Sequence, residues 1–159
     1  MTSWAALTAS LDLCVTVPSI LSIAGPIGPV SLTHDGTSGV QTFTPQPFTA
    51  LSNQVNGATV IFQCVGGFVN TTNPSLLRDC TVGLNVTGFD PGSGWVVDVP
   101  SDQTDVTALI PDVIAQVEAH SDSPGDATFD LSVGMDGGDA SQLPPGVYCT
   151  TVVATITAN

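Results

Sequence analysis

The sequence predicts an all-β protein: a two-sheet sandwich, Ig-like or jelly-roll in topology, with an N-terminal strand of the donor type. Its apolar segments are short and rich in Val, Ile, Thr and Phe. Clusters of Gly, Pro, Asn and Asp separate them, as turns between strands require. The one helical candidate, residues 104–120, is interrupted by Pro111 and alternates from Val113 to Ala119, so a strand is expected there.

Ten strands are expected along the chain, each bounded by turn-forming residues. They cover residues 7–17, 19–24, 29–33, 39–44, 58–65, 80–88, 94–98, 113–120, 126–134 and 146–157. The 159 residues are long enough for one core, and no second domain or repeat is evident. We therefore divide the chain into an N-terminal donor-strand segment, residues 1–18, and a β-sandwich domain, residues 19–159.

The composition excludes several classes of partner. Fourteen acidic residues face a single basic one, Arg78, which gives a formal net charge of −13. Binding to nucleic acid or anionic lipid needs the lysines and arginines that this chain lacks. No apolar stretch is long enough to span a membrane. Only 9% of residues are charged, and Thr, Ser, Asn and Asp carry the polarity instead. We expect an extracellular or cell-surface protein, secreted through a signal peptide that this chain does not include.

The N-terminal strand has one apolar side and one polar side. Leu11, Leu13 and Val15 alternate with Asp12, Cys14 and Thr16, the period of a half-buried strand. The complete apolar side, which forms the candidate donor-strand set, is Leu7, Ala9, Leu11, Leu13, Val15 and Val17. Either the protein's own second sheet or a neighbouring subunit must cover this side.

Four cysteines, an even number without a Cys-x-x-Cys pair, favour two disulfides over a metal site. Strand parity places Cys64 and Cys80 inward, whereas Cys14 and Cys149 point outward. We therefore favour a Cys64–Cys80 pair and a Cys14–Cys149 pair, the second lying either within one subunit or between two. The alternative for Cys64 and Cys80 is that they stay reduced as small buried residues.

Three segments resemble a known group of secreted proteins. The closing "LPPGVYCTTVVATITAN" is similar to the "P-x-G-x-Y-x-x-x-V-x-x-x-I/V-T" strand of fimbrial and spore coat protein U-like domains. The opening "LDLCVTVPSILSI" resembles the start of those domains, and "ATVIFQC" resembles their "T-x-x-x-x-C" strand. The resemblance implies a filament subunit that is joined to its neighbours by donor-strand complementation, as in pili and biofilm-matrix fibres.

The sequence thus predicts a structural protein that polymerises with copies of itself as a homopolymer. Its N-terminal strand would insert into the next subunit, in a filament suited to cell adhesion or matrix scaffolding. The alternative is a monomeric adhesin or carbohydrate-binding module, with a surface or matrix polysaccharide as partner. Trp4, Trp95 and Tyr148 are the aromatic residues that such a module could use for sugar stacking.

Other functional signals are weak. No nucleophile, acid–base or metal motif is present, so neither catalysis nor a metal or other cofactor is expected. The tripeptides at Asn70 and Asn85 match the pattern for N-glycosylation, whereas Pro74 blocks the one at Asn73.

Overall fold

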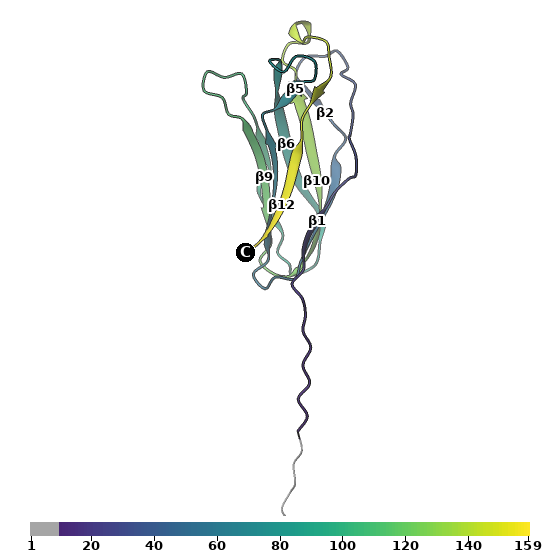
Figure 1. The fold of residues 1–159 in the computed structure, drawn as a ribbon, viewed down its shortest axis with the longest axis vertical. Helices are drawn as coiled ribbons and strands as arrows, with labels where there is room; N and C mark the ends of the chain where they lie inside the picture. The colour runs from purple at the N-terminus through teal and green to yellow at the C-terminus, as the bar shows by residue number, and fades with distance from the viewer. Residues whose placement is uncertain (1–9) are drawn as a thin grey trace, which may run out of the picture.

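Two antiparallel β-sheets pack face to face in the computed structural model, which describes residues 10–159 (Figure 1). The larger sheet contains β1 (Leu21–Ala24), β2 (Val40–Thr42), β3 (Gln46–Ser52), β5 (Phe68–Asn70), β6 (Leu77–Phe89), β8 (Ser101–Gln103), β10 (Gly125–Asp136) and β11 (Tyr148–Cys149). The smaller sheet contains β4 (Ala58–Val65), β7 (Val96–Val99), β9 (Ile114–His120) and β12 (Val152–Ala158). The predicted all-β sandwich is confirmed.

The order of strands places two edges on the same side of the sandwich. The main path of the larger sheet is β1-β3-β10-β6-β5-β11, and that of the smaller sheet is β12-β4-β9-β7. Both β1 and β12 are therefore edge strands, and they approach each other near the lower end (Figure 1). One 3-10 turn, Ala140–Gln142, is the only helical element among residues 10–159.

Aromatic side chains from both sheets form the centre of the core. Phe62 on β4 and Phe129 on β10 are fully buried and meet edge to face, with ring centroids 6.2 Å apart. Trp95 packs edge to face on Phe129 at 5.4 Å, and Phe48 packs on Phe62 at 4.9 Å. Edge-to-face contacts satisfy the quadrupoles of the rings while burying large apolar areas.

No helix in the described part of the chain is long and apolar enough to cross a membrane.

The alternation of apolar and polar residues predicted the central strands well. Residues 58–65 form β4 with the expected bounds, and Val60, Phe62 and Cys64 point inward as parity required. Cys80, Val82 and Leu84 are likewise buried on β6, which runs from Leu77 to Phe89. The segments around 113–120 and 126–134 are also strands, and the first contains no helix.

The ends of the chain differ from the prediction. Residues 10–17 of the expected strand 7–17 pair with no strand, and residues 7–9 lie outside the described residues. Residues 29–33 form no strand either, because Pro26 and Pro29 lack backbone N–H groups and hinder a regular ladder. The expected strand 146–157 is divided into β11 and β12, since the chain passes there from the larger sheet to the smaller. Three strands, β3, β5 and β8, were not predicted.

Candidate functional site

The N-terminal segment projects from the sandwich with its apolar side chains in solvent. We call residues 10–17 the tail. Leu11, Leu13, Val15 and Val17 are 81%, 83%, 89% and 73% exposed. Figure 1 shows the tail leaving the lower end of the sandwich as an extended chain. The exposure of these aliphatic side chains to water is unfavourable, so the tail would gain free energy by binding an apolar surface. Leu7 and Ala9, the other members of the predicted donor set, lie outside the described residues.

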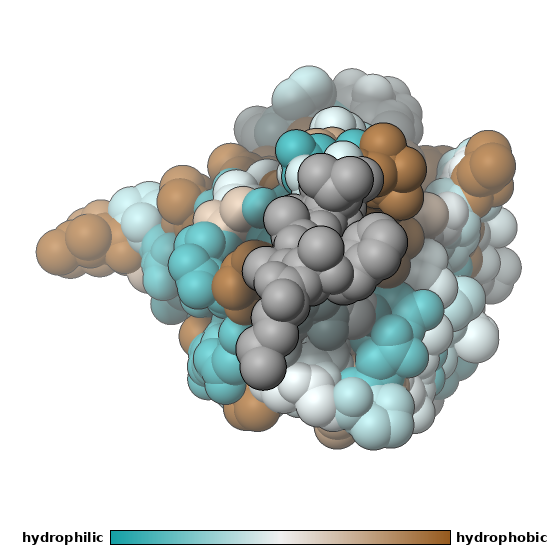
Figure 2. Space-filling model, turned by 90° about the horizontal axis from the view of Figure 1, so that it is seen from below, coloured by the Kyte–Doolittle hydropathy of each residue, from teal (hydrophilic) through white to brown (hydrophobic). Residues whose placement is uncertain are grey.

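The tail begins at a fixed point. Asn53, in the loop after β3, donates its backbone N–H to the carbonyl of Ile20 at 3.1 Å, and its side chain bonds the same stretch of chain. Seen from below, polar and apolar residues intermingle over the visible part of this end, without one large apolar patch beside the tail (Figure 2).

A long, largely apolar hollow lies between residues 26–43 and residues 140–152, and we call it the edge groove. It consists of two adjoining cavities of about 760 and 410 Å³, which share Phe43, Phe68 and Tyr148. The residues that line the smaller cavity come mainly from residues 26–30 on one wall and from residues 148–152 on the other, over a floor that includes Phe48, Leu131 and Val133. An open hollow of this kind in a sandwich is a gap in the packing that an added strand could fill.

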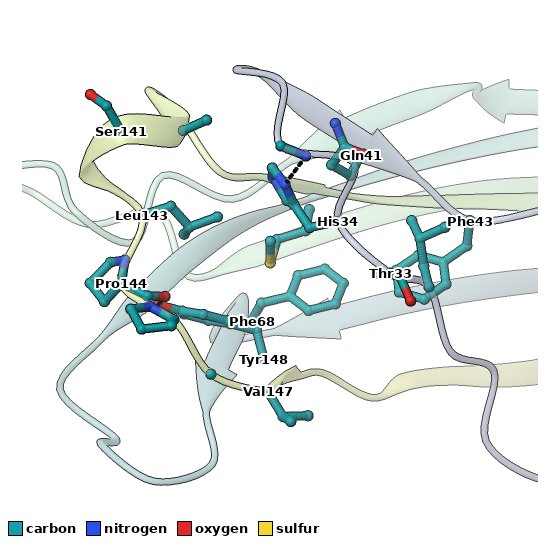
Figure 3. Close-up of a pocket in the computed structure, with 16 residues that line it drawn as sticks. Thr33, His34, Gln41, Phe43, Phe68, Ser141, Leu143, Pro144, Val147 and Tyr148 are labelled. Carbon is teal, nitrogen blue, oxygen red and sulfur yellow. Dashed lines mark hydrogen bonds between the residues drawn. The ribbon is translucent and has the colours of Figure 1, made fainter.

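The larger cavity forms the upper part of the edge groove. Figure 3 shows His34, Gln41 and Phe43 entering it from the N-terminal half of the chain, opposite Pro144 and Tyr148 from the C-terminal half. The Nδ1 atom of His34 accepts a hydrogen bond from the Gly36 N–H at 3.0 Å. Phe43 and Phe68 are stacked with centroids 6.1 Å apart, and the Tyr148 hydroxyl donates to the Pro144 carbonyl at 3.0 Å.

The wall of the edge groove that residues 148–152 form continues into β12, which has a free backbone edge. β12 pairs with β4 on one side, from Val152 opposite Cys64 to Ala158 opposite Ala58, and within the described residues no strand pairs with its other side. Its inward side chains Val152, Ala154 and Ile156 are only half-buried. Unpaired edge strands present rows of N–H and C=O groups to which another strand can add.

The cysteines fall into two classes, as parity predicted. Cys64 and Cys80 are buried between the sheets, whereas Cys14 and Cys149 are exposed, and all four are thiols in this structure. The pKa of the Cys64 thiol is lowered to about 7, chiefly because the Cys80 thiol hydrogen-bonds to it. The same interaction, together with burial, raises the pKa of Cys80. The two inner thiols are thus neighbours, and both predicted disulfides remain predictions. Cys14 lies on the tail and Cys149 on a wall of the edge groove.

The two glycosylation patterns differ in access. Asn70 is only 2% exposed, and its side-chain oxygen accepts hydrogen bonds from the N–H groups of Thr72 and Asn73, both at 3.0 Å. A glycan on the side-chain nitrogen does not fit the fold, so the structure argues against the prediction that Asn70 is a glycosylation site. Asn85 lies on the outer face of β6 and is exposed. The aromatic set for sugar stacking is not brought together either: Trp95 is 3% exposed and lies in the core, and Trp4 falls outside the described residues.

A small ionic cluster lies at the end of β9. The Nδ1 atom of His120 is 2.6 Å from the carboxylate of Asp98, and Nε2 is 3.6 Å from that of Asp122. The pKa of His120 is raised, first by the hydrogen bond with Asp98 and also by the charges of Asp98, Asp122 and Glu118. Within residues 10–159, no group of three or more His, Cys, Asp or Glu side chains is placed to hold a metal ion.

Sequence reasoning found the tail but missed the edge groove. The groove residues Phe43, Phe48 and Phe68 lie in or beside the short strands β2, β3 and β5. The available signal was a pair of proline-interrupted stretches, "AGPIGPV" and "LPPGV", which cannot continue a ladder and so leave neighbouring strands uncovered.

No family model matches this chain, and no curated protein or solved structure matches it.

Proposed function

We propose that the protein is a structural subunit of an extracellular filament, which polymerises head to tail by inserting its tail into the edge groove of the next subunit. The observation that carries the proposal is the coexistence of an unpaired apolar tail and an unfilled apolar groove in one chain. The resemblance of both chain ends to fimbrial and spore coat protein U-like domains is consistent with this arrangement. A pilus-like or matrix fibre, used in adhesion or scaffolding, is the product we expect.

The energetics favour such a joint. Four large aliphatic side chains of the tail are exposed. Their burial contributes roughly 1.5 to 3 kcal/mol each, or about 6 to 12 kcal/mol together, before the cost of ordering the tail and of association. Backbone hydrogen bonds between the tail and the free edge of β12 would also fix the orientation of the tail in the groove.

The geometry favours insertion into a neighbour over insertion into the tail's own subunit. The tail leaves the lower end and points away from the body, whereas the larger cavity lies toward the upper end, near β2, β5 and β11 (Figure 1). The hydrogen bonds of Asn53 hold residues 18–20 in that orientation. The same head-to-tail contact repeated between copies need not close on itself, and an open repeat generates a linear polymer.

The test uses the full chain and two matched aspartate substitutions. Leu13→Asp places a charge on the apolar side of the tail, and Thr16→Asp places one on the polar side. Negative-stain electron microscopy and light scattering should show filaments for the native chain and for Thr16→Asp, and monomers for Leu13→Asp. Compact monomers of the native chain under all assembly conditions would refute the filament and favour the monomeric adhesin or carbohydrate-binding module.

A further inference from the structure

We infer, on the basis of the proposed filament, the register of the joint: the tail lies antiparallel to β11 and β12 of the acceptor subunit, with Cys14 directly opposite Cys149 and linked to it by a disulfide. The inference specifies the strand direction, the residue pairs and the covalent bond. Three independent features of the described residues support it.

The first feature is the direction of the chain. The tail leaves the lower end of its own sandwich, and β12 runs from β11 in the upper half toward the C-terminus in the lower half (Figure 1). A subunit stacked below in the same orientation receives the tail through its upper end. The tail then runs upward in sequence while β12 runs downward, so the two strands are antiparallel.

The second feature is the choice of wall. The tail can form a regular ladder only along the wall built by residues 148–152, because the opposite wall contains Pro26 and Pro29. Prolines lack the N–H groups that a ladder needs. The outer edge of β12 is unpaired within the described part of the chain. We therefore assign the backbone bonds of the tail to the C-terminal wall.

The third feature is the matching of faces. In the register that sets Cys14 opposite Cys149, Leu13 faces Thr150 and Leu11 faces Val152. Both acceptor positions point inward: Thr150 contacts the buried Sγ of Cys64 at 3.1 Å, and Val152 packs on the core. Val15 then faces Tyr148, another inward residue. Each apolar tail side chain enters the edge groove, and no polar one does.

The outward face brings the two exposed thiols together. Cys14 and Cys149 are both exposed. Directly opposite residues at a non-hydrogen-bonded antiparallel position have Cα atoms about 4.5 Å apart, within the range of roughly 4.4 to 6.8 Å that a disulfide spans. A slip of one residue would turn the apolar side to solvent, and a slip of two would keep the faces but separate the thiols.

The oxidant is a small disulfide such as oxidised glutathione. One cysteine thiolate attacks it, forms a mixed disulfide and releases one glutathione thiol; the second cysteine attacks the mixed disulfide and releases the other. Two cysteine sulfurs are oxidised, the two glutathione sulfurs are reduced, and the two protons end on the released thiols.

The experiment moves the acceptor cysteine along the wall while Cys14 stays in place. The native chain is compared with three variants of the full chain: Cys149→Ser alone, Cys149→Ser with Val147→Cys, and Cys149→Ser with Thr151→Cys. Residues 147, 149 and 151 are all exposed. Each sample is assembled with oxidised glutathione, imaged by electron microscopy, and run on denaturing gels with and without reductant.

The register predicts a reducible ladder of multimers for the native chain and none for the other three, although all four form filaments. A ladder from Thr151→Cys or Val147→Cys in place of the native chain would overturn the register by two residues. Filaments without a ladder in any sample would overturn the inference and leave the proposed function intact. Absence of filaments in the native chain would refute the proposed function itself.

Discussion

The side chain of Asn53 binds the base of the tail on both sides of Ser19. Its Oδ1 atom accepts the Ile20 N–H at 2.7 Å, and its Nδ2 atom donates to the Pro18 carbonyl at 2.8 Å. Together with the backbone bond to Ile20, these contacts fix where the tail ends and β1 begins. Gln54, the next residue of the β3–β4 loop, donates its Nε2 to the Ser19 hydroxyl at 2.5 Å, so two loop residues hold the base of the tail.

Asn53→Ala should therefore loosen the base of the tail. Three side-chain hydrogen bonds are lost, two of them to the base of the tail, and each is worth about 0.5 to 1.5 kcal/mol. We expect faster hydrogen exchange over residues 18–24, measured by mass spectrometry, and fewer and shorter filaments. Asn56→Ala is the matched control, because Asn56 is an exposed residue of the same loop whose side chain makes no hydrogen bond within residues 10–159. Equal exchange in the two variants would show that Asn53 does not hold the tail.

The buried thiol pair should govern the stability of the sandwich. If Cys64 and Cys80 form the predicted disulfide, the closed loop of about 15 residues stabilises the fold by about 3 kcal/mol. The hydrogen bond from Cys80 lowers the pKa of Cys64, which favours the thiolate, the reactive form in disulfide exchange.

Thermal unfolding with and without reductant measures this contribution. Reduction should lower the Tm of the native chain, and Cys80→Ala should show no further loss on reduction. Cys14→Ser is the control, and its monomer should behave like the native chain. An unchanged Tm on reduction, with four free thiols found by titration, would show that the pair stays reduced.

The ion pair between His120 and Asp98 should make stability depend on pH. Because Asp98 raises the pKa of His120 in the folded state, the pair stabilises the fold fully below the unfolded pKa of about 6.5. The contribution is lost as the pH rises through the folded pKa. Both side chains are about one third exposed, so solvent screening limits the effect to less than about 1 kcal/mol.

Urea unfolding of the native chain and of Asp98→Asn measures this effect. The difference in unfolding free energy between the two should be larger at about pH 5.5 than at about pH 9. Asp122→Asn, whose carboxylate lies farther from the ring, should show a smaller difference. A difference for Asp98→Asn that does not change with pH would contradict the assignment.

Glycan occupancy should follow burial rather than the tripeptide pattern. Expressed in a host with N-glycosylation, the folded chain should carry a glycan at Asn85 and none at Asn70, because Asn70 is buried and bonded to its own loop. Peptide mapping by mass spectrometry distinguishes the two sites. A glycan at Asn70 on soluble, folded protein would contradict the packing of that loop.

The sequence was sufficient to predict the long inner strands β4, β6, β9 and β10. β4 alternates from Ala58 to Cys64 and lies between β9 and β12, so packing enforces the pattern that its residues already favour. β3 was missed because Pro47 argues against an inner strand. In the structure β1 pairs only with Thr49–Ser52, so the side of Pro47 that lacks an N–H meets no partner.

The regions that sequence reasoning misjudged adjoin the edge groove. Val30 and Leu32 read as part of a strand, but they line the groove half-exposed, with no strand beside them. The tail has a strand pattern and no strand partner within the described residues. A pattern records which face is to be buried, whereas it does not record which molecule supplies the cover. The apolar tail was therefore predictable from the sequence, but the edge groove was not.

A free copy of the tail should cap the growing filament. A synthetic peptide with the sequence of residues 7–17 presents the same apolar side as the tail, and it should occupy the edge groove without offering a groove of its own. Because each capped subunit can no longer accept a neighbour, filament length should fall as the ratio of peptide to protein rises.

The matched control peptide carries Ser at positions 11 and 13, which preserves length and charge but removes two of the aliphatic side chains. Length distributions from electron microscopy should shift with the native peptide and remain unchanged with the control. Equal shortening by both peptides would indicate that backbone addition at β12, rather than burial of Leu11 and Leu13, provides the selectivity of the joint.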